Sequence, residues 1–337
     1  MENAQSFPVG LYLIEKHEIK HSIELARLAE KKGFGCVWQG EEYPPFREAR
    51  DSLIPLAAIA ALTESIKLGT GVLHTWTRNV MTLAMTFATL DELSNGRAML
   101  GIGVLWEPMA RMMGIVRRDT LQAMREHVEA LRALFAMKTV NVEGEFVRLQ
   151  NVHLLKKPTS IPVYIGATGF RMMELAGEIA DGVLMNYLVS PAYNKQALEF
   201  LAKGATKAGR SVTDLDRPQL VACSMDEDAD KAIEIARRVV MEYLFLEPHI
   251  MKASGIRREL LETIRKTLGS WPPTPDRLQA ALEFVDDDLV RSVCAAGTPE
   301  DCRRKVREYV DAGCTCPLIC PISSGVEEMI DAFSGGY

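Results

Sequence analysis

The stretch IKLGTGVLHTWTRNVMTLAMTFATLDELSNGRAMLGIG, Ile66–Gly103, decides the fold of this chain. Its pattern predicts a strand over Ile66–Leu73, an amphipathic helix over Thr82–Leu93, a stop at Asn95–Gly96 and a second strand over Ala98–Ile102. The segment is therefore one βαβ step, which joins parallel strands. Both strands carry glycines at their exits, where parallel α/β folds place the loops that face a ligand. A binding site is predicted here.

The alternation of short apolar strands and helices continues along the whole chain. About eight or nine strands, nearly every one followed by a helix, indicate an α/β protein of the (β/α)8 TIM-barrel class rather than an open sheet. We expect one domain over residues 1–337. The remaining predicted pairs of strand and helix are Val9–Ile14 with Ile19–Lys32, Gly35–Gln39 with Ser52–Leu62, Val163–Ile165 with Met172–Ile179, Gly182–Met185 with Tyr193–Ala208, Leu220–Ser224 with Ala229–Leu246, Val290–Ala295 with Pro299–Ala312, and Pro317–Pro321 with Glu327–Phe333.

Two stretches interrupt this rhythm and are predicted to be insertions. Residues 140–155 alternate around Gly144 as a β-hairpin does, and residues 248–284 are helical with a break at Pro272–Pro273. Insertions on a barrel commonly build a substrate lid or a contact between subunits.

Composition narrows the class of partner. The chain has 337 residues, of which 47% are hydrophobic and 25% charged, with a net charge of −6. A negative net charge favours binding neither to nucleic acid nor to an anionic membrane, so a small-molecule substrate fits better. The N-terminal residues lack the basic and apolar regions of a signal peptide, and no apolar run is long enough for a membrane helix. We therefore expect a cytoplasmic protein.

Seven cysteines raise the question of a metal site, because Cys314, Cys316 and Cys320 lie close together. They surround apolar residues and run into Pro321, as a buried strand would, and no fourth ligand is spaced to complete a zinc or iron–sulfur motif. We favour reduced, structural cysteines and predict no metal.

Five sequence blocks, in this order, resemble the bacterial luciferase-like superfamily of flavin and deazaflavin barrels. Within it, the chain is most similar to methylenetetrahydromethanopterin reductases and their coenzyme F420-dependent relatives. The blocks are GTGVLHTWTRN at Gly69–Asn79, ATLDELSNGRAMLGIG at Ala88–Gly103, PVYIGATG at Pro162–Gly169, ELAGEIADGVLMN at Glu174–Asn186 and DDDLVRSVCAAGTPED at Asp286–Asp301.

The resemblance implies a hydride-transferring oxidoreductase that uses coenzyme F420. An FMN-dependent two-component monooxygenase of the same superfamily is the alternative, and a barrel that has lost catalysis is a third possibility. The family also implies a homodimer or higher homo-oligomer, for which the apolar helix Thr82–Leu93 offers a surface.

The resemblance further implies a bulge at the end of the third strand, with a non-prolyl cis peptide against the cofactor ring, and the matching pair is Gly71–Val72. A glycine that merely ends a strand is the alternative. His74 follows this bulge, and Gly103 with Val104 ends the next strand, so we expect all three to contact the cofactor. A plain packing role remains open for His74.

The turn Gly166, Ala167, Thr168 and Gly169 lies between an apolar strand and a helix. Unpaired amides at a helix N-terminus attract an anion, and glycine lets a phosphate approach the backbone, so this turn is predicted to bind the cofactor phosphate. An ordinary strand–helix loop is the alternative. Asn186, at the end of the following strand, is expected beside the anion, where its amide either binds or caps.

Glu41 and Glu42 follow the second strand, where reductases of the family carry an Asp-His pair. Two neighbouring carboxylates repel each other, so one of them is a candidate proton donor, while solvated loop charges are the alternative. Tyr12 replaces a family glutamate on the first strand. Its phenol is a candidate acid, with simple packing as the alternative.

Overall fold

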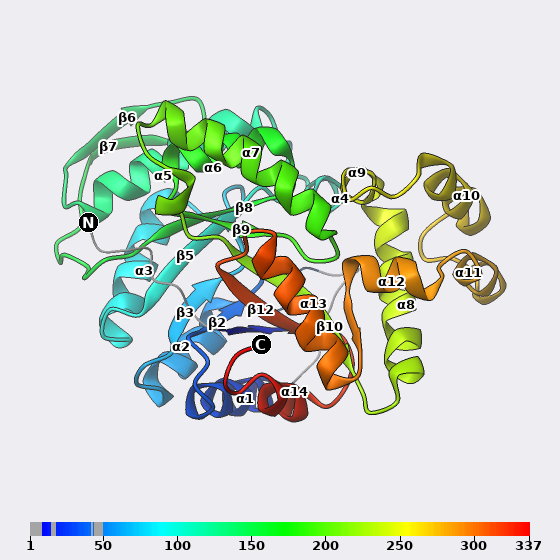
Figure 1. Cartoon of the computed structure of the whole chain (residues 1–337). Helices are drawn as coiled ribbons and strands as arrows, with labels where there is room; N and C mark the ends of the chain where they lie inside the picture. Colours follow the sequence, from blue (N-terminus) through cyan, green and yellow to red (C-terminus); the bar gives the residue numbers. More distant parts are fainter. Residues whose placement is uncertain (1–8, 15–17, 42, 44–49) are drawn as a thin grey trace.

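The computed structural model describes residues 9–14, 18–41, 43 and 50–337, and its centre is a parallel β-barrel (Figure 1). In these ranges eight strands follow one another around the barrel in chain order. They are β1 (Gly10–Leu13), β2 (Cys36–Gln39), β3 (Lys67–Thr70), β5 (Ala98–Gly103), β8 (Val163–Ala167), β9 (Gly182–Met185), β10 (Pro218–Met225) and β12 (Cys316–Pro321). The barrel closes where Gln219 of β10 lies opposite Met185 of β9. The predicted TIM-barrel class is confirmed.

Two short strands extend this sheet at the carboxyl ends of its neighbours. β4 (Leu73–His74) pairs with the end of β5, and β11 (Ala295–Gly297) pairs with the end of β10. The single strand predicted over Ile66–Leu73 is therefore two strands, β3 and β4. Gly71 and Val72 separate them, and the peptide bond between these two residues is cis, as the resemblance implied.

Helices cover the outside of the barrel (Figure 1). Those around it are α1 (Ile19–Lys31), α2 (Leu53–Leu62), α3 (Val80–Leu93), α4 (Glu107–Met112), α5 (Thr120–Phe135), α6 (Phe170–Ile179), α7 (Pro191–Lys207), α8 (Ala229–Leu246), α12 (Asp287–Val293), α13 (Pro299–Asp311) and α14 (Val326–Ala332). The sequence analysis did not identify α4 and α5. In the described ranges, no helix combines the length and apolar character needed to cross a membrane.

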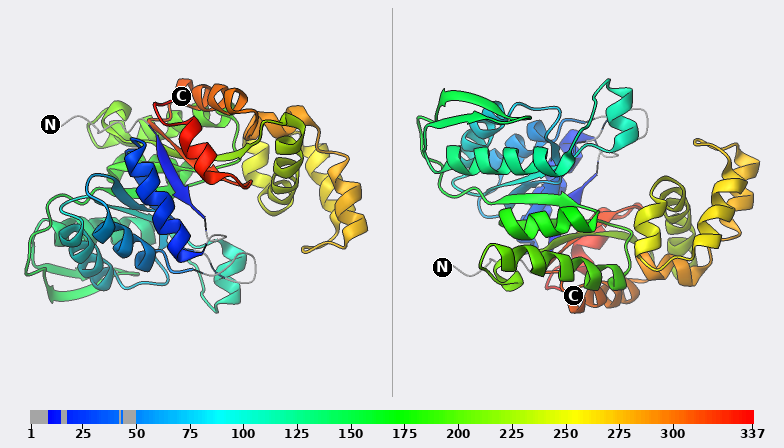
Figure 2. Two further views of the ribbon diagram at one scale, coloured as in Figure 1. Left: turned by 90° about the horizontal axis from the view of Figure 1, so that it is seen from below. Right: turned by 90° about the horizontal axis from the view of Figure 1, so that it is seen from above.

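Both interruptions of the barrel rhythm have the predicted secondary structure. Strands β6 (Val140–Glu143) and β7 (Arg148–Val152) form an antiparallel hairpin. Three helices follow α8, namely α9 (Pro248–Ala253), α10 (Arg258–Leu268) and α11 (Pro275–Leu282). Figure 2 shows this helical lobe projecting from one side of the barrel and the hairpin on the opposite side.

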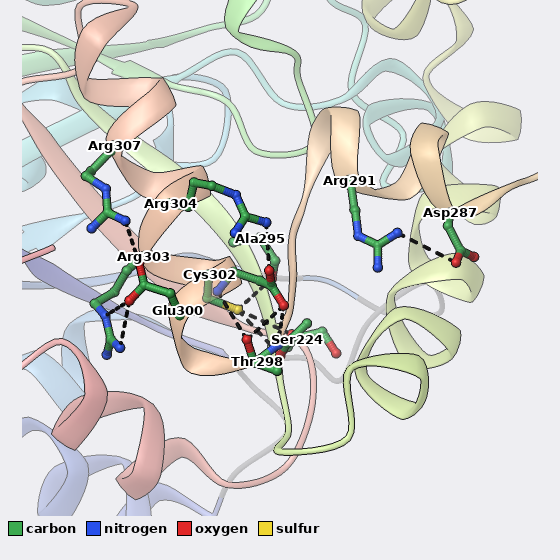
Figure 3. Close-up of polar contacts among 12 residues, drawn as sticks. Ser224, Asp287, Arg291, Ala295, Thr298, Glu300, Cys302, Arg303, Arg304 and Arg307 are labelled. Carbon is green, nitrogen blue, oxygen red and sulfur yellow. Dashed lines mark hydrogen bonds and ion pairs between the residues drawn. The ribbon is translucent and has the colours of Figure 1, made fainter.

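The strand predicted over Val290–Ala295 is wrong, because most of this segment is helix α12. The Asp286 side chain accepts a hydrogen bond of 2.8 Å from the Leu289 amide and so caps the helix. Arg291 reaches back 3.7 Å to Asp287, one turn earlier (Figure 3). The strand begins only at Ala295, because the apolar positions before it have helical rather than alternating spacing.

The barrel interior is filled by aromatic and sulfur-containing side chains. Trp38 and Tyr164 meet edge to face with their ring centroids 5.1 Å apart. Cys316 and Cys320 belong to the same buried cluster, and Cys316 Sγ lies 3.7 Å from Cys36 Sγ. Cys314 is buried too, so the structural interpretation of the three cysteines agrees with their position.

Candidate active site

Two adjoining cavities lie where the carboxyl ends of the barrel strands meet the surrounding helices. The smaller, about 390 Å³, is lined by the turn after β8 and is called the turn cavity below. The larger, about 520 Å³, is lined by α4, α8 and α9 and is called the helix cavity. Both volumes are typical of small-molecule sites. The two cavities share Gly71, Val72, Val104, Thr168 and Asn186.

Val72 stands at the junction of the two cavities because two glycines leave room for it. A Cβ atom on Gly103 would lie 2.6 Å from Val72 Cγ2, and one on Gly166 would lie 2.7 Å from Val72 Cγ1. Any side chain at either position would push Val72 out of place. The arrangement presents a small apolar surface to both cavities, which suits the face of a flat ring.

Tyr12 supports this junction from the barrel interior. Its hydroxyl donates a hydrogen bond of 2.6 Å to the Gly71 carbonyl oxygen, and its side chain is buried in the barrel interior. Tyr12 is not among the residues that line either cavity. The structure thus places it where it can hold the backbone of the bulge.

The turn Gly166, Ala167, Thr168 and Gly169, which is predicted to bind the cofactor phosphate, lines the turn cavity. Gly169 precedes the first residue of α6, and a Cβ atom added to it would meet no atom within 4 Å. The approach to this helix N-terminus is therefore open, as an anion site requires. Arg171 also lines the cavity. The sequence analysis missed this cation, although its place in the first turn of the helix was a usable signal.

Asn186 lines both cavities, and its contacts reach towards α8. The amide Nδ2 donates a hydrogen bond to the Tyr243 hydroxyl, and the backbone carbonyl of Asn186 accepts one of 3.3 Å from Gln219 Nε2. Burial raises the pKa of Tyr243 well above its usual value, so its hydroxyl stays neutral. The side chain of Asn186 thus links the end of β9 to α8.

Glu41 lies in the wall of the helix cavity and is 8% exposed. Its carboxylate forms an ion pair with Arg78 and accepts a hydrogen bond of 2.8 Å from the Tyr43 hydroxyl. Burial raises the pKa of Tyr43 to about 12. The sequence analysis did not identify Arg78 as the partner of Glu41. Glu42 lies outside the described residues.

His74 also lines the helix cavity, next to the bulge. Burial lowers the pKa of its imidazole, so the ring is neutral near pH 7. Within the described part of the chain, its buried Nδ1 atom has no hydrogen-bond partner. A buried ring nitrogen in this condition favours a ligand that supplies the missing contact.

Residues of α8 and α9 also line the helix cavity. Neither helix was predicted to contribute to the site. Glu247 lies where these helices meet, and only 14% of its side chain is exposed. Burial raises the pKa of this carboxyl group to about 7. The usable signal was an acidic residue between the apolar end of α8 and Pro248.

Comparison with known proteins agrees with this architecture. A family model described as luciferase-like monooxygenase matches residues 6–316. A 5,10-methylenetetrahydromethanopterin reductase of Methanolobus tindarius is 32% identical over 307 residues, which are 91% of each chain. An F420-dependent glucose-6-phosphate dehydrogenase of Nocardia farcinica is 30% identical over 86% of this chain and 84% of that protein. The solved coenzyme F420-dependent tetrahydromethanopterin reductase of Methanopyrus kandleri superimposes with a TM-score of 0.86 at 28% identity, covering 98% of each chain.

Proposed function

This chain belongs to the luciferase-like monooxygenase family, and we propose that it is a coenzyme F420-dependent oxidoreductase acting on a small organic substrate. The observation that carries the proposal is similarity over most of the chain to an F420-dependent reductase and to F420-dependent dehydrogenases. The paired cavities at Val72 support it, because they offer adjoining space for a cofactor and a substrate. A methylenetetrahydromethanopterin reductase serves as the model for the reaction.

The residues present fit a deazaflavin cofactor with a phosphate-bearing tail. Val72 would support the ring, helped by Gly71, His74, Gly103 and Val104. The tail would lie in the turn cavity, against the residues Gly166, Ala167, Thr168, Gly169, Arg171 and Asn186. When bound, a deazaflavin supplies a hydride, and the protein's task is to orient the reactants and exclude water.

The predicted catalytic residues take different roles in this proposal. Tyr12 holds the Gly71 carbonyl and so positions the bulge. Glu41 has both of its carboxylate oxygens engaged, by Arg78 and by Tyr43, so it orders the cavity wall rather than releasing a proton. Glu42 stays a prediction.

An FMN-dependent monooxygenase is the second candidate, since the family model that matches the chain is described as luciferase-like monooxygenase. Titrating the purified protein separately with F420 and FMN, and following quenching of tryptophan fluorescence, distinguishes the two. We expect saturable binding of F420, followed by hydride exchange with an added substrate. Tight binding of FMN with oxygen-dependent turnover would instead support the monooxygenase.

We also propose that the protein forms a homodimer through α2 and α3. These helices present exposed apolar side chains, with Ile54 67% and Met85 53% exposed. Between the helices lies an apolar groove of about 350 Å³. A second copy of the chain would remove this surface from water.

A further inference from the structure

We propose that Glu247 is the proton donor of the reaction, delivering a proton to a heteroatom of the substrate in the helix cavity. The inference rests on the proposed function, which requires a substrate that accepts a proton as well as a hydride. Glu247 lies between α8 and α9, and it is not one of the site residues predicted from the sequence.

The position of Glu247 is the first observation. Glu247 lines the same cavity as Val72 and His74. Its backbone amide donates to the Tyr243 carbonyl at 2.9 Å, and its carbonyl accepts from the Ile250 amide at 3.0 Å. These contacts hold the residue at the junction of α8 and α9, so the group is fixed rather than carried on a free loop.

The partners of Glu247 do not stabilise its charged form. In the described ranges, no lysine or arginine lies within 4 Å of its carboxylate oxygens. The neighbouring His249 places Nδ1 3.4 Å from Glu247 Oε2, but partial burial lowers the pKa of that imidazole, which is neutral near pH 7. Arg117, which lines the same cavity, already forms an ion pair with Glu107 at 2.7 Å. Glu247 therefore differs from Glu41, whose charge Arg78 balances.

Several other groups that titrate or carry charge line the same cavity. These groups come from α4 and the loop after it, β4, α8, the segment after β9 and the segment after β2. They are Glu107, Arg117, His74, Glu242, Tyr243, Tyr187, Glu41 and Tyr43. Glu107 and Glu41 are already paired with arginines, and it is burial that raises the pKa of Glu247 to about 7. A proton donor works best with a pKa near the operating pH.

The proposed step is a simple proton transfer in the reductive direction. The O–H bond of the Glu247 carboxyl group breaks, and an N–H or O–H bond forms on the substrate. The carboxylate that remains takes a new proton from solvent at the α9 side of the cavity, where His249 is 65% exposed. No further reactant is needed for this step.

Glu247→Gln tests the proposal, because glutamine keeps the shape and loses the acid. We expect kcat to fall about 100-fold while the affinity for F420 stays unchanged. Wild-type kcat should decline as the pH rises through about 7, and this limb should be absent from the variant. The matched control is Glu259→Gln, an exposed carboxylate on α10, which should behave as wild type. Wild-type kcat with an unchanged pH profile in Glu247→Gln would overturn the proposal.

A second readout needs neither cofactor nor turnover. An infrared pH titration of the protein alone should show the carbonyl stretch of a protonated carboxyl group disappearing near pH 7 in wild type and in Glu259→Gln, but missing from Glu247→Gln. A band that titrates near pH 4.5 would contradict the inference. If the protein does not bind F420 at all, the proposed function fails while this titration still reports on Glu247. Should Glu247→Gln not fold, Glu247→Asp should keep the titrating band and lose turnover.

Discussion

At the scale of single residues, the candidate site depends on glycines, which carry no side chain. Val72 reaches the junction of the two cavities only because Gly103 and Gly166 carry no Cβ atom. Gly169 serves a different purpose, since the space beside it is open. The first two glycines allow protein packing, whereas the third leaves backbone amides accessible to a ligand.

Replacing Gly169 by alanine separates these two purposes. Its φ of −96° suits alanine and the new Cβ would meet no protein atom, so the free energy of unfolding should change by only about 0.5 kcal/mol. We expect the Kd for F420 to rise about tenfold, because the methyl group occupies the approach to the helix amides. Calorimetry with F420 and with a deazaflavin lacking the phosphate measures both effects. Equal affinity of variant and wild type for F420 would show that the phosphate does not bind here.

At the scale of elements, the C-terminal part of the barrel is defined by helix caps. The Thr298 side chain accepts from the Asp301 amide, and Asp301 accepts from the Thr298 amide, which forms a capping box at the start of α13 (Figure 3). Cys302 in the next turn lies 3.5 Å from the Ala295 carbonyl oxygen. This packing joins α13 to β11 and β10.

Removing the cap should therefore destabilise the protein without touching the site. Thr298→Ala is expected to lower the free energy of unfolding by about 1 kcal/mol, because the first-turn amides lose their acceptor. Urea denaturation followed by circular dichroism measures the change. Thr298→Ser, which keeps the hydroxyl, is the matched control and should stay close to wild type. A loss of F420 affinity in Thr298→Ala would mean that this helix communicates with the cavities.

At the scale of the whole molecule, the proposed dimer surface is open to a direct test. Met85→Glu places a charge in the apolar groove of α2 and α3, and we expect it to convert a dimer into a folded monomer. Size-exclusion chromatography with light scattering measures the mass. Phe284→Glu, an exposed apolar position in the helical lobe, is the control that should leave the mass unchanged. A wild-type protein that is already monomeric would refute the proposed interface.

The pH dependence of stability also belongs to the whole molecule. Burial lowers the pKa of His74 and of His127, so both stay neutral in the folded chain while the unfolded chain takes up protons below about pH 6.5. Stability from these groups is present above pH 6.5 and is lost as the pH falls, by about 1 kcal/mol per pH unit for each histidine.

Unfolding free energies measured at pH 5, 6 and 7 check this expectation. The double variant His74→Gln with His127→Gln should lose stability less steeply on acidification than wild type. Glu247 acts in the opposite direction, since its raised pKa removes stability as the pH rises through about 7. The comparison therefore uses the difference between the two proteins. Identical slopes would show that neither histidine is held neutral.

By itself, the sequence determined the barrel and the turns that carry glycines at the ends of its strands. Alternating apolar strands and helices are local patterns, so they can be recognised without knowledge of tertiary contacts. The bulge at Gly71–Val72 followed from the resemblance of the sequence to a known family. The prediction failed at α12, where a short helix, Asp287–Val293, is followed almost directly by the strand β11.

Only the tertiary structure decided which side chains meet. The ion pair of Glu41 with Arg78, the support of Gly71 by Tyr12 and the place of Glu247 in the cavity wall each join segments far apart in the chain. Such contacts depend on how the barrel closes and where its insertions lie. Burial, which sets the charge state of His74 and Glu247, is likewise a property of the packed molecule and not of any stretch of its sequence.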